Sequence, residues 1–131
     1  MIKILLVEDE KTIIENLSAF LVQEGFYVKH AAGQTNALHL LSQEPFDLVL
    51  LDISLSDGNG FSVCSAIKSE YRLPVIFLTA SDDEYSTVTG FDLGADDYIS
   101  KPFLPRELIA RIKNILSLTG HTGTTVTIGA V

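Results

Sequence analysis

The sequence predicts an α/β fold built on a doubly wound, five-stranded parallel sheet. Apolar runs of strand length alternate with longer amphipathic stretches, which is the pattern of repeated strand–helix units. The runs are almost wholly apolar rather than alternating, as expected of strands that are buried on both faces. Because right-handed crossovers leave few topologies, we expect the common strand order 2-1-3-4-5.

The expected strands are short and the expected helices longer. The strands lie at residues 2–7, 27–31, 48–51, 75–78 and 98–99, of which the last is the weakest. Apolar residues at helical spacing occur within residues 13–21, 37–41, 61–67 and 108–116. The last stripe is the most regular, and Pro105 before it suits a first helical turn. Residues 83–93 predict a weaker helix, because they contain serine, threonine and glycine, which are poor helix formers.

Composition limits the class of protein. A chain of 131 residues favours one domain, and a single cysteine excludes an internal disulfide. The apolar run at residues 4–7 is too short for a signal peptide, and no stretch approaches the roughly 20 apolar residues of a membrane span. We therefore expect a soluble, cytoplasmic protein without membrane contact. The net charge of −8, without a basic stripe, argues against direct binding of nucleic acid.

The C-terminal residues differ in character from the rest of the chain. Residues 120–125 (GHTGTT) indicate a linker, and residues 126–131 (VTIGAV) indicate the start of a strand. The prediction is one domain at residues 1–119, followed at residues 120–131 by a linker and the start of a truncated C-terminal domain.

Chemically active side chains stand where four of the expected strands end. Glu8, Asp9 and Glu10 follow the first strand, Asp52 ends the third, Thr79 follows the fourth and Lys101 follows the fifth. In the expected order these strands are neighbours, and the ligand sites of such sheets form beyond the carboxyl ends of the strands. We therefore expect these groups to share one crevice.

The chemistry of this group fits a cation and a phosphoryl group. Three carboxylates at close range repel one another unless a cation lies among them, and oxygen ligands suit Mg²⁺. Asp52 is held at the end of a buried strand, and a positioned aspartate can attack phosphorus to give an aspartyl phosphate. Phosphoryl transfer requires mainly positioning and charge neutralisation, to which Lys101 contributes a point charge and Thr79 a hydroxyl.

Each of these residues alone has an ordinary explanation. An aspartate at a strand end often caps a helix or forms a turn, and acids before a helix complement its dipole. A lysine before proline is usually a solvated surface residue. The functional interpretation depends on complementary groups at four strand ends together.

The same residues resemble a known family, the receiver domains of bacterial response regulators. The motifs that carry the resemblance are ILLVEDE, FDLVLLDISLSDGNGF, PVIFLTA and GADDYISKPF, which extend over about residues 1–118. The resemblance implies a flavodoxin/CheY-like (βα)5 fold. It also implies a switch that accepts a phosphoryl group from a sensor histidine kinase in a Mg²⁺-dependent reaction. Such a domain is not otherwise an enzyme, since it catalyses only its own phosphotransfer and autodephosphorylation.

The resemblance assigns the acceptor and the metal ligands to particular positions. Asp52 is similar to the phospho-accepting aspartate of the family. Glu8 and Asp9 look like the acid pair that binds Mg²⁺ together with Asp52. The backbone carbonyl of Ser54 would be a further metal ligand.

The resemblance also assigns residues that respond to the phosphoryl group. Thr79 and Lys101 match the residues that hold it. Tyr98 matches the switch aromatic, which turns inward when the threonine moves; its ordinary explanation is a half-exposed strand tyrosine. Pro102 matches the proline after the lysine, which is often preceded by a cis peptide bond.

Three further features resemble the OmpR/PhoB subfamily. They are GADDYISKPF, the pair Glu107-Leu108 and the terminal VTIGAV. Members of this subfamily regulate transcription through a winged-helix DNA-binding domain after the linker. On phosphorylation they form homodimers through the face of the fourth helix, fifth strand and fifth helix. The charged residues that match this face are Asp96, Asp97, Glu107 and Arg111.

The sequence departs from the family pattern in three places. Ser56 replaces the usual proline, which predicts a more mobile loop after Asp52. Thr87 replaces a lysine that would pair with Glu107 across the dimer, which predicts a weaker dimer. Ser54 and Ser81 are small at positions that tune dephosphorylation, which predicts ready access of water to the phosphoryl group.

Three other interpretations compete with a phosphorylated switch. A small phosphohydrolase with an aspartyl nucleophile would usually need a second aspartate where Ser54 stands, and a cap or pocket for its substrate. An FMN carrier would need a hydroxyl- or glycine-rich loop after the first strand, where acids stand instead. A degenerate receiver used only as a scaffold would not need the complete set of acids, threonine and lysine.

Overall fold

The computed structural model describes residues 1–55, 57–79, 92, 94–101 and 103–118, with only the backbone of Thr79. The expected weak helix at residues 83–93 lies almost wholly outside this part of the chain, as do Ser56, Pro102 and residues 120–131. No helix within the described residues is both long and apolar enough to cross a bilayer.

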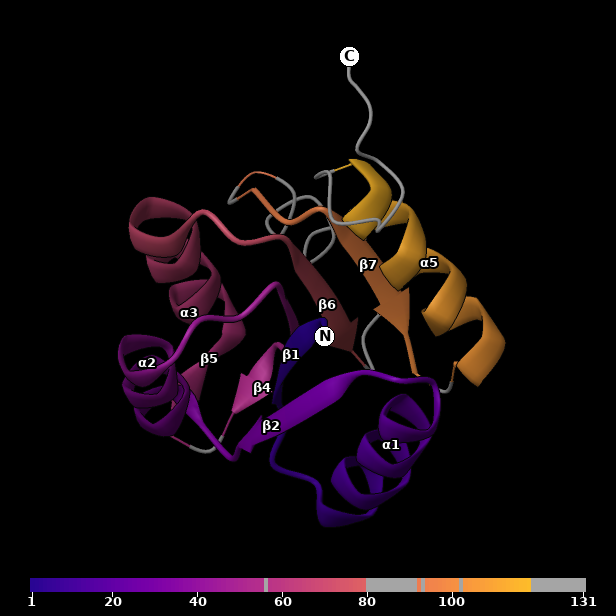
Figure 1. Ribbon diagram of the computed structural model, residues 1–131. Helices are drawn as coiled ribbons and strands as arrows, with labels where there is room; N and C mark the ends of the chain where they lie inside the picture. The colour runs from indigo at the N-terminus through magenta and orange to yellow at the C-terminus, as the bar shows by residue number, and fades with distance from the viewer. Residues whose placement is uncertain (56, 80–91, 93, 102, 119–131) are drawn as a thin grey trace.

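Five parallel strands form the central sheet, in the order β2-β1-β3-β6-β7 (Figure 1). The strands are β1 (Lys3–Val7), β2 (Tyr27–Ala31), β3 (Leu48–Asp52), β6 (Val75–Thr79) and β7 (Asp97–Ser100). Since β6 and β7 are the fourth and fifth strands of this sheet along the chain, the predicted order 2-1-3-4-5 is confirmed. The predicted strand positions are also confirmed, to within one residue at each end.

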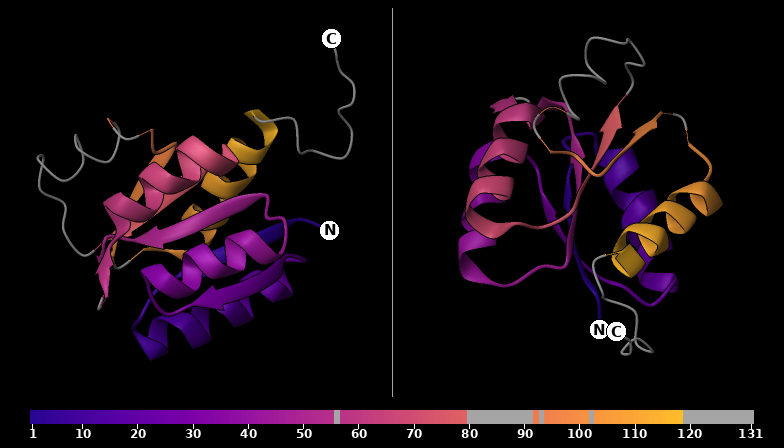
Figure 2. Two further views of the ribbon diagram at one scale, coloured as in Figure 1. Left: turned by 90° about the vertical axis from the view of Figure 1, so that its left-hand side faces the viewer. Right: turned by 90° about the horizontal axis from the view of Figure 1, so that it is seen from above.

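Helices cover both faces of the sheet. The helices α1 (Lys11–Gln23) and α5 (Pro105–Leu118) lie on one side, and α2 (Gln34–Gln43) and α3 (Gly60–Ala66) lie on the other (Figure 2). The π-helical turn η1 (Ile67–Tyr71) continues α3. The result is the doubly wound, three-layer α/β fold that the sequence predicts.

Each central strand contributes to two hydrophobic cores. Ile4 and Leu6 of β1 pack with the α1 and α5 side, whereas Leu5 and Val7 pack with the α2 and α3 side. All four side chains are fully buried, and burial of each stabilises the fold by about 2 kcal/mol. Successive side chains of a strand point to opposite faces, so burial on both faces explains why the run is continuously apolar.

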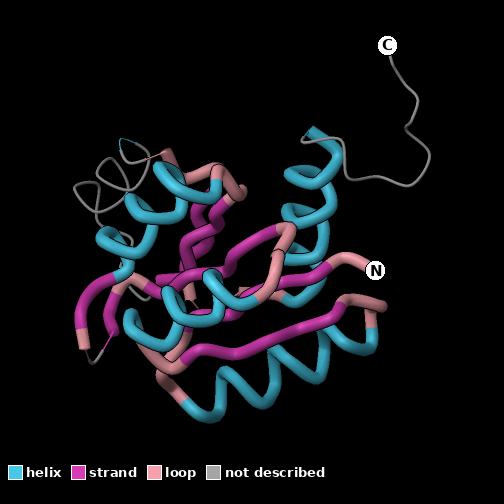
Figure 3. Tube along the Cα trace, turned by 60° about the vertical axis from the view of Figure 1, so that its left-hand side comes forward, coloured by secondary structure: helices cyan, strands magenta, loops and turns pink. Residues whose placement is uncertain are grey.

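The strands are in register at their carboxyl ends. Val7 pairs with Leu51 and Asp52 pairs with Leu78. The strands lie side by side between the two helical layers (Figure 3), so residues that follow β1, β3 and β7 emerge at one edge of the sheet.

A two-stranded hairpin follows Asp52 and was not predicted. It consists of β4 (Ser54–Leu55) and β5 (Gly58–Asn59), which pair antiparallel. The Asn59 side chain accepts a hydrogen bond from the Ser62 N–H at 2.9 Å and so caps α3. Gly60 lies so close to the Asp52 carbonyl oxygen that a Cβ atom there would clash with backbone. Glycine at this position therefore lets the hairpin fold back beside the end of β3.

Candidate functional site

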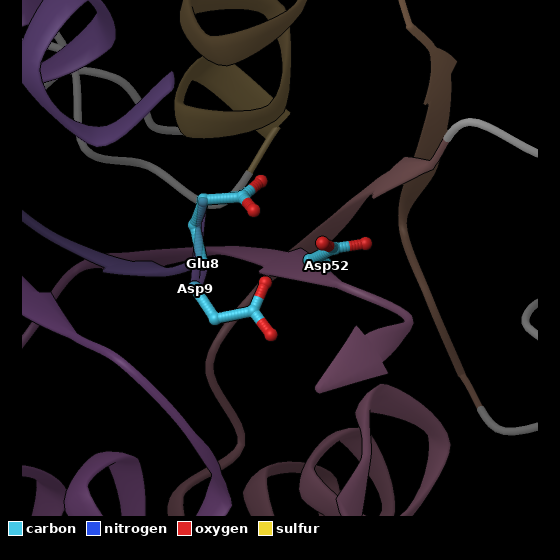
Figure 4. Close-up of side chains that lie close together, drawn as sticks. All are labelled: Glu8, Asp9 and Asp52. Carbon is cyan, nitrogen blue, oxygen red and sulfur yellow. The ribbon is translucent and has the colours of Figure 1, made fainter. Parts of the chain in front are cut away.

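Three carboxylates meet beyond the ends of β1 and β3. Glu8 and Asp9 come from the residues directly after β1, and Asp52 is the last residue of β3 (Figure 4). One oxygen atom from each lies within 4.8 Å of the others. Glu8 and Asp52 are buried, with exposed fractions of 1% and 6%, whereas Asp9 is exposed. The predicted acidic crevice is thus present in the structure.

Glu8 is fixed through both its backbone and its side chain. Its N–H donates to the Ala31 carbonyl at 3.0 Å, and its own carbonyl lies 3.1 Å from His30 Nε2. The first contact extends the backbone pairing of β1 with β2 by one residue, and the second adds a side-chain contact from β2. One carboxylate oxygen, Oε2, accepts the Glu10 N–H at 3.0 Å. This oxygen also helps to start α1, because the first N–H groups near a helix start lack helical partners.

Lys101 connects the two buried carboxylates. Its Nζ lies 2.7 Å from Glu8 Oε1 and 3.2 Å from Asp52 Oδ2, and its side chain is only 14% exposed. The loop after β7 therefore brings the predicted lysine into the crevice. One ammonium stands against three carboxylates, which leaves the cluster negative when all three are ionised.

Burial and charge shift the proton affinities of this group. Burial and the nearby Glu8 charge raise the pKa of Asp52 from 3.8 to about 6, although Lys101 acts in the opposite direction. Burial by itself would lower the pKa of Lys101, but its hydrogen bond with Glu8 and the charges of Asp52 and Glu8 raise it overall. At neutral pH Lys101 is charged and Asp52 is mostly ionised, the form in which a carboxylate is nucleophilic.

The oxygen atoms of this cluster fit a hard cation. The donor set is all oxygen, it is net negative and part of it is exposed at Asp9. Both Glu8 oxygens already accept a hydrogen bond, from Lys101 and from the Glu10 N–H. The Asp52 oxygens accept longer contacts, from Lys101 at 3.2 Å and from the Ser54 N–H at 3.3 Å. Asp9, which is exposed, and Asp52, which is held less closely than Glu8, are therefore the side chains better placed to take a cation.

The family of the chain follows from a comparison with known proteins. The family model for the response regulator receiver domain matches residues 4–113. The chain belongs to this family. The resemblance inferred from the sequence motifs is therefore confirmed at the level of the receiver domain.

Individual relatives agree with this assignment. The transcriptional regulatory protein GltR of Pseudomonas aeruginosa is 47% identical over 116 residues, which is 86% of this chain and 48% of that protein. The chain thus spans about half the length of this curated relative. The non-phosphorylated HemR receiver domain of Leptospira biflexa is 36% identical, with full coverage of both chains and a TM-score of 0.85. The BeF3-activated DrrB receiver domain is 40% identical, covers 89% of this chain and 98% of that chain, and has a TM-score of 0.81.

The other predicted site residues of this receiver domain are placed to different extents. The Ser54 N–H lies 3.3 Å from Asp52 Oδ1, so its backbone stands beside the acceptor. The backbone of Thr79 pairs with Ser100 at the carboxyl end of β6, but its side chain is outside the described part. The predicted cis bond before Pro102 also falls outside it.

The predicted switch residue, Tyr98, is turned into the protein. Its hydroxyl oxygen is buried, and its ring lies against Phe77 of β6, with 5.7 Å between the ring centroids. Phe77 in turn contacts Phe61 of α3 edge-on, with centroids 5.5 Å apart. A row of aromatic rings therefore connects β7 of the receiver domain with the helical layer formed by α2 and α3.

The charged residues predicted for a dimer face divide into two groups. Arg111 Nη1 donates to both carboxylate oxygens of Asp97 at 2.9 and 3.0 Å, and Arg111 Nη2 lies 3.5 Å from Glu107 Oε2. Asp96 is engaged elsewhere. Its Oδ2 accepts from Lys68 Nζ at 2.6 Å and from the Val75 N–H at 2.8 Å, which connects η1 to the start of β6. Asp97, Glu107 and Arg111 thus form one surface cluster, apart from Asp96.

A groove of about 580 Å³ adjoins the acidic crevice. Its walls come mainly from apolar side chains of α1 and of the segment before α5, among them Ile13, Leu17, Phe20 and Phe103. Lys101 lines the groove as well as contacting Asp52. The groove and the site of the receiver domain are therefore continuous.

Sequence reasoning missed two contacts around this site. His30 supports the Glu8 carbonyl, and Asp57 in the hairpin turn binds the start of α2. The Asp57-Gly58 pair signals a turn in the sequence, but no local pattern indicates which helix the aspartate reaches.

Proposed function

We propose that this chain is a phosphorylation-controlled switch with Asp52 as its acceptor. The observation that carries the proposal is the buried Asp52 carboxylate at the end of β3, with Lys101 Nζ at 3.2 Å and two further carboxylates within reach. A phosphohistidine of a sensor histidine kinase is the proposed donor. An Asp52 oxygen forms the new bond to phosphorus, and the bond from phosphorus to the imidazole nitrogen breaks with its electron pair left on that nitrogen.

The residues of the crevice have distinct proposed roles. Asp9, Asp52 and the backbone carbonyl of Ser54 would hold Mg²⁺, with Glu8 supporting the group through Lys101. When bound, Mg²⁺ supplies positive charge to the carboxylates and to the phosphoryl oxygens. Lys101, already beside Asp52, would turn to a phosphoryl oxygen as a point charge, and the Thr79 hydroxyl would donate to another. Apart from its own phosphotransfer and autodephosphorylation, the chain would turn over no substrate.

The proposed output is dimerisation and transcription control, as in the OmpR/PhoB subfamily. The Asp97, Glu107 and Arg111 cluster on β7 and α5 offers charges for such a face. The relative GltR carries the name of a transcriptional regulatory protein and is about twice as long as the matched region. We propose that a winged-helix DNA-binding domain follows residue 119 in the complete protein and that the protein acts in the cytoplasm.

Labelling with a small phosphodonor tests the acceptor. Phosphoramidate with Mg²⁺ is expected to add one phosphoryl group to the wild-type chain, seen by intact mass, and none to Asp52→Asn. With beryllofluoride and Mg²⁺, size-exclusion chromatography should show a dimer of the wild-type chain only. Labelling of Asp52→Asn at another residue, or labelling in excess EDTA, would contradict the proposal.

The groove beside α1 suggests where the kinase binds. Because Lys101 lines both groove and site, a helix that presents a phosphohistidine to Asp52 would cover the groove, and apolar walls suit such a helix. We predict that Ile13→Glu slows phosphotransfer from the kinase at least about tenfold, the cost of placing a charge against an apolar surface. Labelling by phosphoramidate should be unchanged, because the small donor needs no groove.

Val22→Glu is the matched control for this prediction. Val22 is an apolar residue of the same helix, is 57% exposed and is not among the groove residues. It should leave both reactions unchanged. Equal rates from the kinase for Ile13→Glu and Val22→Glu would remove the groove from the proposed interface.

A further inference from the structure

Asp57 caps a helix to which it does not belong. The helix α2 begins after Gly33, which has no side chain with which to cap it. Instead, Asp57 Oδ1 accepts the Gln34 N–H at 2.7 Å and Oδ2 accepts the Thr35 N–H at 3.1 Å. These N–H groups have no partner within the helix, and the positive end of the helix dipole favours a carboxylate. The hydrogen bond from the Gln34 N–H, and to a lesser extent that from the Thr35 N–H, lowers the pKa of Asp57.

Small residues beside Gln34 and beside Asp57 leave room for this contact. A Cβ atom on Gly33 would clash with Asp57 Oδ1, so a side chain at the ordinary capping position would displace the aspartate. The backbone of Gly33 is extended, with φ −162°, which any residue can adopt. Glycine is therefore needed there for space, not for conformation. A Cβ atom on Gly58 would likewise clash with the Gln34 side chain.

The same aspartate sits in the turn of the hairpin that follows the acceptor. In the hairpin, Ser54 pairs with Asn59 and Leu55 pairs with Gly58, so the turn lies between Leu55 and Gly58. The far leg is attached to α3 through Asn59, and Gly60 N donates to the Ile53 carbonyl at 2.7 Å. Asp57 attaches the turn itself to α2. The hairpin is thus held at two places, on two different helices.

The near leg of the hairpin starts at the acceptor. Ser54 lies two residues after Asp52, and its N–H points to Asp52 Oδ1 at 3.3 Å. Ser54 has no side-chain bond to a helix among the described contacts. Its backbone is held by its pairing with Asn59, by the bond from the Gly60 N–H to the neighbouring Ile53 carbonyl, and by the turn. A shift of the turn relative to α2 would therefore move the Ser54 backbone relative to Asp52.

We infer that Asp57 is a positioning residue for the site at Asp52, which holds the Ser54 backbone where it can complete the ligand set of a divalent cation. The inference rests on the proposed function and extends it to a residue that would touch neither the cation nor the phosphoryl group. The contact with α2 then acts on Mg²⁺ binding from a distance, through the hairpin.

Titration calorimetry with Mg²⁺ alone tests the inference. Asp57→Ala should raise the Kd for Mg²⁺ by about tenfold, the lower end of what loss of a supporting contact costs a metal site. Asp57→Asn also loses the negative charge but keeps an oxygen that can accept the Gln34 N–H, so its Kd should stay close to that of the wild-type chain. A raised Kd in Asp57→Asn equal to that of Asp57→Ala would mean that charge, not position, is responsible, and would overturn the inference.

A double variant separates positioning from helix capping. Once Asp57 is alanine, the space beside residue 33 is free, and Gly33→Ser then provides α2 with a cap of its own. Gly33→Ser/Asp57→Ala should regain thermal stability relative to Asp57→Ala while its Kd for Mg²⁺ stays raised. Recovery of Mg²⁺ affinity together with stability would mean that Asp57 acts only as a helix cap, and would overturn the inference. Failure of the wild-type chain to bind Mg²⁺ would instead overturn the proposed function, and this inference with it.

Discussion

Replacing Lys101 with methionine is expected to lower the free energy of unfolding by about 3 kcal/mol at pH 7.5 without Mg²⁺. The Lys101 ammonium lies between two buried carboxylates, 2.7 Å from Glu8 and 3.2 Å from Asp52. Methionine keeps most of the aliphatic stem but leaves both carboxylates without their cation. Urea denaturation in EDTA, followed by circular dichroism, measures the change.

Two conditions should restore stability to Lys101→Met. Acidification to pH 5 allows a carboxylate to take up a proton, which removes the repulsion within the pair. Added Mg²⁺ places another cation among the oxygens and stabilises the folded state by mass action. Phosphorylation should still be lost or greatly slowed, because Mg²⁺ does not replace the point charge beside the phosphoryl oxygens. With Mg²⁺ present, this variant would then be stable but not phosphorylated, which distinguishes the two roles of Lys101.

Lys68→Met is the matched control for Lys101→Met. Lys68 also pairs with an aspartate, with its Nζ 2.6 Å from Asp96 Oδ2, but both side chains of that pair are more exposed, at 25% and 30%. Loss of such a pair costs roughly 0–1 kcal/mol. If Lys101→Met were no less stable than Lys68→Met in EDTA, the crevice would not be the low-dielectric site that its burial indicates.

Most of the fold could be predicted because its signal is local. The run from Ile4 to Val7 is apolar at every position since each face of β1 is covered by helices. The site was predictable for a related reason, because parallel strands bring their carboxyl ends to one edge of the sheet. Once the strand order was known, Asp9, Asp52 and Lys101 had to lie near one another.

The sequence could not predict that Glu8 and Asp9 have different roles in the site. The two acids are adjacent, and a pattern treats them as a pair. In the structure Glu8 is buried against Lys101, whereas Asp9 is exposed. Both acids follow the end of β1 and reach the same cluster, so the position of Lys101, which only the packed structure shows, decides which of them is buried.

The contact between Asp57 and α2 could not be predicted for a different reason. Gln34 and Thr35 lie 23 and 22 positions before Asp57 in the chain, and no sequence signal connects them with the aspartate. This contact also bears on the prediction that Ser56 makes the loop after Asp52 more mobile. Residue 56 lies outside the described part, so that stays a prediction.

Replacing Asp52 with asparagine is expected to raise the free energy of unfolding by about 2 kcal/mol at pH 7.5 without Mg²⁺. The pKa of Asp52 is raised from 3.8 to about 6, first by burial and then by the Glu8 charge. The folded state therefore binds a proton more tightly than the unfolded chain, and ionised Asp52 costs stability above pH 6. This cost is relieved as the pH falls from about 6 towards 4.

The pH dependence gives this prediction its control. The advantage of Asp52→Asn should be complete at pH 7.5 and should shrink as the pH falls through 6, because the wild-type carboxyl then becomes neutral as well. Asp9→Asn removes a charge from the same cluster at an exposed position and should change stability much less. Thermal unfolding in EDTA at several pH values measures all three chains. A wild-type chain more stable than Asp52→Asn at pH 7.5 would contradict the prediction.

Mg²⁺ should reverse the order of stability. A cation that binds only the folded state stabilises it by RT ln(1 + [Mg²⁺]/Kd), so the chain with the lower Kd gains more. Wild type, with both Asp9 and Asp52 available, should gain stability on addition of Mg²⁺, whereas Asp52→Asn should gain little. The same carboxylate would thus destabilise the folded chain when no cation is bound and bind the cation that makes phosphorylation possible. A functional site of this kind retains ionised Asp52 despite its cost, since a neutral side chain at residue 52 could neither hold Mg²⁺ as tightly nor attack phosphorus.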